Sequence, residues 1–175
     1  MSVLHGDHIE AAGAIAGALR ARGPRILLET HGLAIDGIES VIAGVDVVSM
    51  DWKLSSDVRR ASDPKRGEVE AFHGEHEKFL AIARRAPELI VKLVITPTSL
   101  DDEIDEAVSR VEANAPEATL ILQPVTPFGA VREAPSAECL LARCARISSR
   151  LANVRVIPQP HQIYGALWSA RRGRC

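Results

Sequence analysis

The sequence predicts an α/β protein in which about five parallel strands alternate with helices, as an open sheet or as part of a (β/α) barrel. Five short apolar segments recur along the 175 residues, and each connection between them is long enough to hold one helix. The apolar segments are continuous runs rather than alternating ones, which is typical of strands in a parallel sheet that helices cover. We expect one domain over 1–165 and a solvated tail over 166–175.

The first part of the chain contains two predicted strands. A helical pattern runs over 7–22 and stops at the pair Gly23-Pro24. A strand over 25–29, a short helix over 36–43 and a strand over 45–50 follow. The first helix is expected to present one apolar face, which consists of Ile9, Ala12, Ile15, Ala16 and Leu19.

The rest of the chain repeats the same alternation. Ser99 to Asp102 have the composition of a helix N-terminal cap, and Ser136 is a second expected cap. Pro87 lies just beyond the end of the longest expected helix. The expected elements are, in order, a helix over 69–85, a strand over 89–95, a helix to 113, a strand over 120–122, a helix over 136–151 and a strand over 154–157.

The composition restricts the classes of function. The net charge is −2 and no block of like charges occurs, so electrostatic binding to nucleic acid or to a membrane has no support. No apolar stretch approaches the roughly 20 residues that span a bilayer, and the start of the chain lacks the pattern of a secretory signal. The cysteines Cys139, Cys144 and Cys175 form an odd set without metal-type spacing, which favours a reduced, cytoplasmic setting.

Polar side chains lie where each predicted strand ends. A polar residue at a single strand end is most often a turn former or a helix cap. Because the carboxyl ends of parallel strands meet at one mouth, five strands that end in this manner favour a shared site there. In chain order, the polar residues are Glu29, Thr30 and His31; Ser49, Asp51 and Lys53; Thr96; Gln123 and Thr126; and Gln159 and His161.

Four of these strand ends, taken together, resemble motifs of radical S-adenosylmethionine (SAM) enzymes, and specifically of the 7-carboxy-7-deazaguanine synthase family. LLETHG over 27–32 resembles the family's ETNG-type strand end. VVSMDWKLSS over 47–56 is similar to the segment in which a serine and a lysine meet the cofactor. LQPVTP over 122–127 resembles the QP strand end, and VRVIPQPHQIYG over 154–165 resembles the closing PQTHK-type motif. The motifs occur in the family's order, over nearly the whole chain.

This resemblance implies an incomplete radical SAM (β/α) barrel and a lyase reaction in queuosine biosynthesis. In the family, a [4Fe-4S] cluster cleaves SAM reductively, and the 5′-deoxyadenosyl radical abstracts hydrogen from 6-carboxy-5,6,7,8-tetrahydropterin. Ring contraction and loss of ammonia follow with the assistance of Mg²⁺, and members are often homodimers. The residues that the resemblance assigns to SAM are Ser49, Asp51, Lys53, Gln123, Pro124 and Val125, and those that it assigns to the pterin are Glu29, Gln123 and His161.

The sequence also departs from the family pattern. The cluster is held by three cysteines near the amino terminus, whereas no cysteine precedes Cys139 here, and the Gly-Gly-Glu-Pro motif that binds the SAM amino group is absent. SVLHGDHIEAAG over 2–13 resembles the residues that follow that motif, so we expect the chain to begin downstream of it. This polypeptide alone is therefore expected to be inactive. Continuation beyond the closing motif to Cys175 places a carboxy-terminal substrate contact in doubt.

Other polar clusters are expected to have structural rather than functional roles. His73 and His76, three residues apart, could bind a metal but are expected on a solvated helix face. His5, Asp7 and His8 are expected in a frayed amino terminus, and Cys139 and Cys144 as small apolar residues of a helix. Lys92, inside a strand, either points into the mouth to pair with Glu29 or Asp51 or extends outward, and the sequence leaves this open.

Three alternative functions stay open at this stage. One is another radical SAM enzyme of the glycyl-radical activase type, because such enzymes share parts of the same strand ends. The second is a metal-dependent (β/α) hydrolase or isomerase with Glu29, His31, Asp51 and His161 as ligands. The third is a non-catalytic partner that completes its barrel with another chain through the exposed edge of its first strand.

Overall fold

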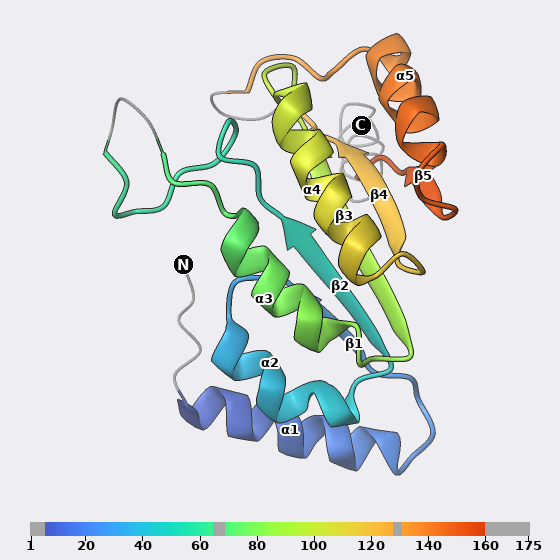
Figure 1. Cartoon of the computed structure of the whole chain (residues 1–175). Helices are drawn as coiled ribbons and strands as arrows, with labels where there is room; N and C mark the ends of the chain where they lie inside the picture. Colours follow the sequence, from blue (N-terminus) through green and yellow to red (C-terminus); the bar gives the residue numbers. More distant parts are fainter. Residues whose placement is uncertain (1–5, 65–68, 128–130, 160–175) are drawn as a thin grey trace, which may run out of the picture.

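Five parallel strands form one sheet in the computed structural model, which describes residues 6–64, 69–127 and 131–159. Neighbours in the sheet are also neighbours in the chain, in the order β1-β2-β3-β4-β5 (Figure 1). The predicted α/β class is confirmed, and the sheet does not close into a barrel. The strands are β1 (Leu27–Thr30), β2 (Val47–Trp52), β3 (Glu88–Ile95), β4 (Thr119–Pro124) and β5 (Val154–Val156).

The described helices lie on one side of this sheet, the near side in Figure 1. Strand order follows chain order without reversal, and right-handed crossovers then place every crossover helix on the same face. The other face of the sheet, which we call the open face, has no helix in the described part of the chain. The helices are α1 (Gly6–Arg20), α2 (Ile35–Val41), the 3-10 turn η1 (Ile42–Gly44), α3 (His73–Ala83), α4 (Asp101–Asn114) and α5 (Ala137–Ser148).

The hydrophobic core lies between the helices and the sheet. Along β3, burial alternates: Leu89, Val91, Leu93 and Ile95 are buried under the helices, whereas the residues between them are only half-buried. The continuous apolar run over 89–95 therefore conceals a two-residue alternation. Helices cover one face of the sheet, and the residues of that face are the more deeply buried set.

The first helix does not bury the face that its sequence pattern predicts. Of the predicted face, the small residue Ala16 is buried, but Ile15 and Leu19 are 59% and 43% exposed. The reason is close packing, because a Cβ atom on Gly13 would lie 3.7 Å from the Val41 side chain. Small residues of α1 therefore face α2 and η1. Ile9 belongs to 6–10, of which only the backbone is described.

One of the two predicted helix caps is confirmed. Ser136 caps α5, since its Oγ accepts a hydrogen bond from the Cys139 N–H at 3.1 Å. The cap of α4 is instead Leu100, without a side-chain bond, and Ser99 has another role. Its Oγ accepts the N–H of Thr96 at 2.8 Å and thus closes the turn after β3. In the described ranges, no helix has the length and apolarity that crossing a membrane requires.

Candidate functional site

Four charged side chains on the open face form one continuous chain of ion pairs, which we call the charge network. Lys92 Nζ lies 2.6 Å from Glu29 Oε1 and 3.0 Å from Asp51 Oδ1, and Lys53 Nζ lies 2.9 Å from Asp51 Oδ2. The register of the sheet explains this arrangement, because Asp51 pairs directly with Lys92 and Glu29 lies one pleat away, opposite Ser49. The orientation that the sequence left open for Lys92 is therefore the one toward Glu29 and Asp51.

The network keeps its central members ionised. Burial acts to raise the pKa of Asp51, but hydrogen bonds and charges from Lys53 and Lys92 outweigh it, and the pKa of Asp51 is lowered. Burial acts to lower the pKa of Lys92, but Glu29 and Asp51 outweigh it, and the pKa of Lys92 is raised. The Lys92 side chain is only 12% exposed and that of Glu29 is 70% exposed. The outer carboxylate is thus accessible to a ligand, while the ammonium that holds it is shielded.

The other predicted site residues divide between the two faces. Ser49 is buried on the open face, opposite Glu29 and Ile90. Ile121 pairs with Lys92 and so lies on the open face. Gln123, two residues further along β4, lies on the open face as well and is half-buried. Pro124 has the opposite parity and pairs with Ile95, on the helix-covered side. The Val125 N–H donates to the Ile95 carbonyl at 2.9 Å, and His161 lies outside the described residues.

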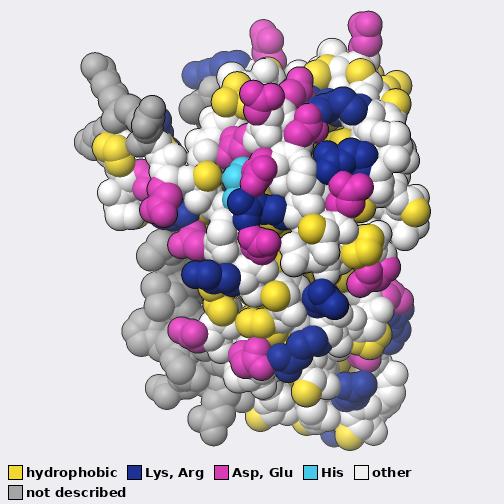
Figure 2. All heavy atoms as spheres, in the orientation of Figure 1, with side chains coloured by type: hydrophobic (Ala, Val, Ile, Leu, Met, Phe, Trp, Pro, Cys, Tyr) yellow, Lys and Arg dark blue, Asp and Glu magenta, His cyan; other side chains and the backbone are white. Residues whose placement is uncertain are grey.

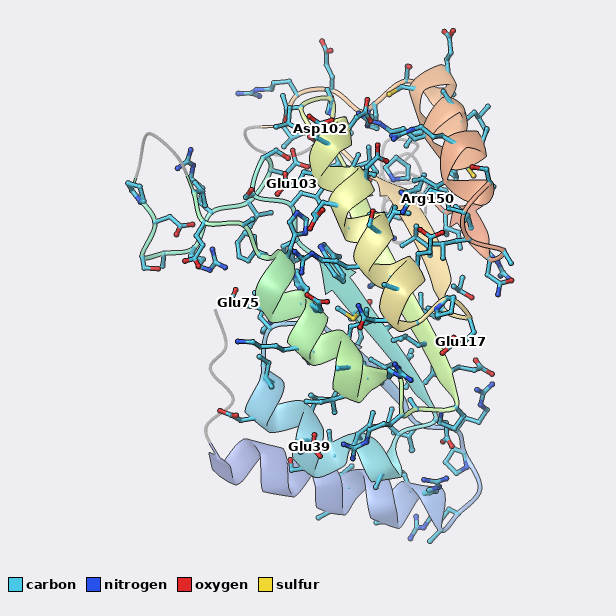
Figure 3. All side chains as sticks on the ribbon, viewed as in Figure 1. Glu39, Glu75, Asp102, Glu103, Glu117 and Arg150 are labelled. Carbon is cyan, nitrogen blue, oxygen red and sulfur yellow. The ribbon has the colours of Figure 1, made fainter. Side chains whose placement is uncertain are left out.

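The connection after β2 is held in place by a carboxylate that the sequence did not suggest. Glu103, at the start of α4, accepts hydrogen bonds from the N–H and hydroxyl of Ser55 and, at 3.0 Å, from the N–H of Ser56. Figure 3 shows Glu103 near this connection. Burial acts to raise the pKa of Glu103, but these donors outweigh it, so the pKa is lowered. The residues directly after Lys53 are therefore fixed to α4.

A second carboxylate fixes the same connection to the turn after β3. Asp57 Oδ1 accepts hydrogen bonds from the hydroxyls of Thr96 at 2.6 Å and Thr98 at 3.2 Å, and Ser99 donates to Oδ2. Thr96 was expected to contribute to the mouth, but it is buried and occupied by this turn. Its hydroxyl stabilises the local turn, as is most often the case for a single polar residue at a strand end.

His73 and His76 are buried, so the expectation of a solvated helix face is wrong. His73 is 7% exposed and its Nδ1 accepts the Trp52 indole N–H at 3.1 Å. His76 is fully buried, and its Nε2 accepts the Lys53 N–H at 2.8 Å. The same ring donates from Nδ1 to the Gly32 carbonyl at 2.9 Å. Polar groups at the ends of β1 and β2 lie under α3 and require partners there, which explains the burial.

Burial sets the protonation state of His76. It lowers the pKa of the imidazole from 6.5 to about 4, and the charges of His73, Lys53 and His31 act in the same direction. The hydrogen bond to the Gly32 carbonyl acts to raise the pKa but is outweighed. A neutral ring matches the hydrogen bonds, because Nε2 can accept from a backbone N–H only when it carries no proton.

The described residues do not assemble a metal centre. In the described ranges, no group of three or more His, Cys, Asp or Glu side chains is placed to hold an ion. Glu29 and Asp51 both bind Lys92, and His31 Nδ1 accepts the Leu33 N–H at 3.2 Å. The ligand set expected for a metal-dependent hydrolase is therefore not formed by its described members.

The cysteines likewise do not fit a [4Fe-4S] cluster. Cys139 and Cys144 are five positions apart on α5, both partly exposed, and Cys175 lies outside the described residues. Three thiolates that converge on one iron-sulfur centre are not present in this arrangement.

No family model matches the chain, but a curated enzyme is similar to it over most of its length. The chain is 31% identical over 147 residues to the 7-carboxy-7-deazaguanine synthase of Geobacter sulfurreducens. The aligned region covers 81% of this chain and 52% of that enzyme, so the chain spans about half the length of its relative. The family resemblance carried by the strand-end motifs is thus confirmed by overall identity: over most of its length, this chain is similar to about half of a 7-carboxy-7-deazaguanine synthase.

Proposed function

We propose that this chain takes part in SAM-dependent chemistry of the 7-carboxy-7-deazaguanine synthase type, and that its open face binds SAM and a reduced carboxypterin. One observation carries the proposal. Glu29, Asp51 and Lys53, which the family resemblance assigns to these ligands, come from two strands and belong to a single charge network. A shared pocket requires this convergence, and scattered strand-end residues would not produce it.

The charges of the network suit the two ligands. SAM carries a sulfonium, an ammonium and a carboxylate, so a surface with alternating cations and anions can pair with it. The Lys53 ammonium can pair with the carboxylate of SAM, and the Asp51 oxygens can accept hydrogen bonds from the hydroxyls of SAM. The exposed Glu29 carboxylate is suited to accept hydrogen bonds from the amino and amide edge of a pterin, and Gln123 can donate and accept. Lys92 balances both carboxylates, so neither ligand meets two bare negative charges.

For this polypeptide we propose ligand binding and orientation, and we expect no SAM cleavage by the chain alone. The cluster that supplies an electron to SAM in the family requires thiolate ligands that the described residues do not gather. The role of Mg²⁺ in the family has no matching group of three acidic side chains in the described part either. Reaction of the ordered ligands would need those components from elsewhere. The cytoplasm is the proposed location.

Calorimetric titration of the purified chain with SAM, and separately with anaerobic 6-carboxy-5,6,7,8-tetrahydropterin, tests the proposal. Saturable binding of each ligand at one site per chain is expected. Asp51→Asn and Lys53→Met should weaken SAM binding by about 10-fold, the effect of about 1.4 kcal/mol. The control is Lys78→Met, because Lys78 is an exposed lysine of α3 on the helix-covered side. Absence of saturable binding, or an equal loss in the control, would contradict the proposal.

A second candidate is a partner protein that completes its barrel with another chain, as a homodimer or a hetero-complex. The edge of β1 favours it, because β1 is an end strand of the sheet and has no second partner strand among the described residues. The helix-covered face gives no sign of a nucleic-acid partner, since Figure 2 shows cationic and anionic side chains interspersed over it. Light scattering decides: a monomer that binds SAM removes this candidate.

A further inference from the structure

We infer that His76 is a positioning residue, which joins the ends of β1 and β2 from the helix side and thereby presents Asp51 and Lys53 on the open face. The inference rests on the proposed function for the identity of the presented ligand, SAM. The His76 ring lies beside the rings of Trp52 and Phe72, on the helix-covered side of the sheet. It acts through the backbone of the strand ends, as its two hydrogen bonds to Gly32 and Lys53 show.

The two strand ends need such a connection. The ladder between β1 and β2 finishes at the pair Thr30 and Met50, while β2 continues to Trp52. Gly32 and Lys53 therefore lie beyond the last pairing of the two strands. The imidazole bridges them, with 2.9 Å from Nδ1 to the Gly32 carbonyl and 2.8 Å from Nε2 to the Lys53 nitrogen. The His76 side chain of α3 thus connects the two strands beyond their last backbone pairing.

The bridge is closely packed. The His76 ring is fully buried, with its centroid 5.0 Å from that of Trp52 and 6.1 Å from that of Phe72. Gly32 has a φ of +69°, and a Cβ there would lie 3.0 Å from His76 Nδ1 and 3.0 Å from the Asp51 carbonyl oxygen. The end of β1 is therefore packed closely against both the ring and the backbone of Asp51.

The anchored backbone carries the side chains that face the ligand. Asp51 and Lys53 are alternate residues whose side chains bind each other at 2.9 Å on the open face. The backbone N–H of Lys53 donates its hydrogen bond to Nε2 of His76. A lateral movement of this segment would displace both charges relative to Lys92, which stays in the centre of the sheet on β3. His76 thus fixes the geometry of the network without contributing a group to it.

Three variants test the inference by SAM calorimetry. His76→Leu removes donor and acceptor together, and SAM binding is expected to weaken by about 10-fold. His76→Gln keeps an amide donor and an amide acceptor, and its affinity should stay within about 3-fold of that of the unmodified chain. Phe79→Leu is the matched control, because Phe79 is also buried on α3, three residues on, and forms no hydrogen bond to the strand ends. Equal losses in His76→Leu and Phe79→Leu would overturn the inference.

A ligand-free readout separates this inference from the proposed function. Amide exchange of the Lys53 N–H, followed by NMR, should be about 10-fold faster in His76→Leu than in Phe79→Leu at equal global stability. Unchanged exchange would overturn the positioning role whether or not SAM binds. Absence of SAM binding with accelerated exchange would contradict the proposed function and leave the bridge established. Should His76→Leu not fold, the ¹⁵N shifts of the unmodified ring decide: a proton on Nε2 at pH 7 refutes the bridge.

Discussion

Acid should destabilise this protein in part through the buried imidazole of His76. The pKa of His76 is about 4 in the folded chain, against 6.5 when the group is exposed. Above pH 6.5, the ring is neutral in both states and the folded state has its full stability. As the pH falls below 6.5, the unfolded chain takes up the proton and the folded chain does not, so the free energy of unfolding decreases. The decrease ends near pH 4, where the folded ring is protonated as well.

The magnitude follows from the two pKa values. Each pKa unit corresponds to about 1.36 kcal/mol, so the complete difference between 6.5 and about 4 amounts to about 3 kcal/mol. Between pH 7 and pH 5, most of the proton uptake by the unfolded state takes place, and the loss is about 2 kcal/mol. A domain of ordinary stability would lose a substantial fraction of its free energy of unfolding in this interval.

Urea unfolding at a series of pH values from 7 to 5, followed by circular dichroism, measures this loss. The comparison is with His76→Gln, in which no group titrates at this position and all other groups, including the buried His73, are kept. The difference in unfolding free energy between the two proteins should change by about 2 kcal/mol over the interval, in favour of His76→Gln at low pH. A constant difference over the whole range would refute the assignment of a neutral, shielded ring.

Substitutions at three further positions have expected outcomes. Gly32→Ala should lower the free energy of unfolding by at least about 1 kcal/mol in urea titrations, because φ is +69° and the added Cβ meets backbone at 3.0 Å; an unchanged midpoint would show that this turn can relax. Lys92→Met should cost roughly 1 kcal/mol at pH 7, less in high salt, since the Asp51 carboxylate keeps Lys53 as a partner; a gain in stability would contradict the pairing. Ser136→Ala should cost about 1 kcal/mol in thermal unfolding through the lost cap of α5, whereas Ser136→Asp should not.

The order of strands and helices could be predicted from the sequence because each strand is a short apolar run bounded by turn residues. The run LIVKLVI over 89–95 identifies β3 to within one residue of its start. The same run does not reveal which residues face the helices, because apolar side chains occur on both faces of the strand. Lys92 is the exception within it, and its direction depended on β2, which places Asp51 opposite it in register. Long-range register is not encoded in the local pattern of either strand.

The candidate site was partly predictable for the same reason. Strand-end position alone was enough to group Glu29, Asp51 and Lys53, because parallel strands all end at one edge of the sheet. The misjudged part is the helix segment FHGEHE over 72–77, whose alternating polar residues are typical of a solvated surface. Its histidines are buried because the Trp52 indole and the Lys53 N–H need acceptors beneath α3. Such a need becomes visible only when α3 is placed over β2.

Because helices cover only one face of the sheet, alternate residues of each strand lie in different environments. Positions such as Val91 and Leu93 are confined by close packing and tolerate few replacements. Neighbouring positions such as Ile90 and Val94 face away from the helices and are only half-buried. On the proposed binding face, substitutions at these positions would change the surface offered to a ligand, with a smaller cost in stability than substitutions in the core. Under that proposal, a change in ligand preference can arise from alternate strand positions alone, while the architecture is kept.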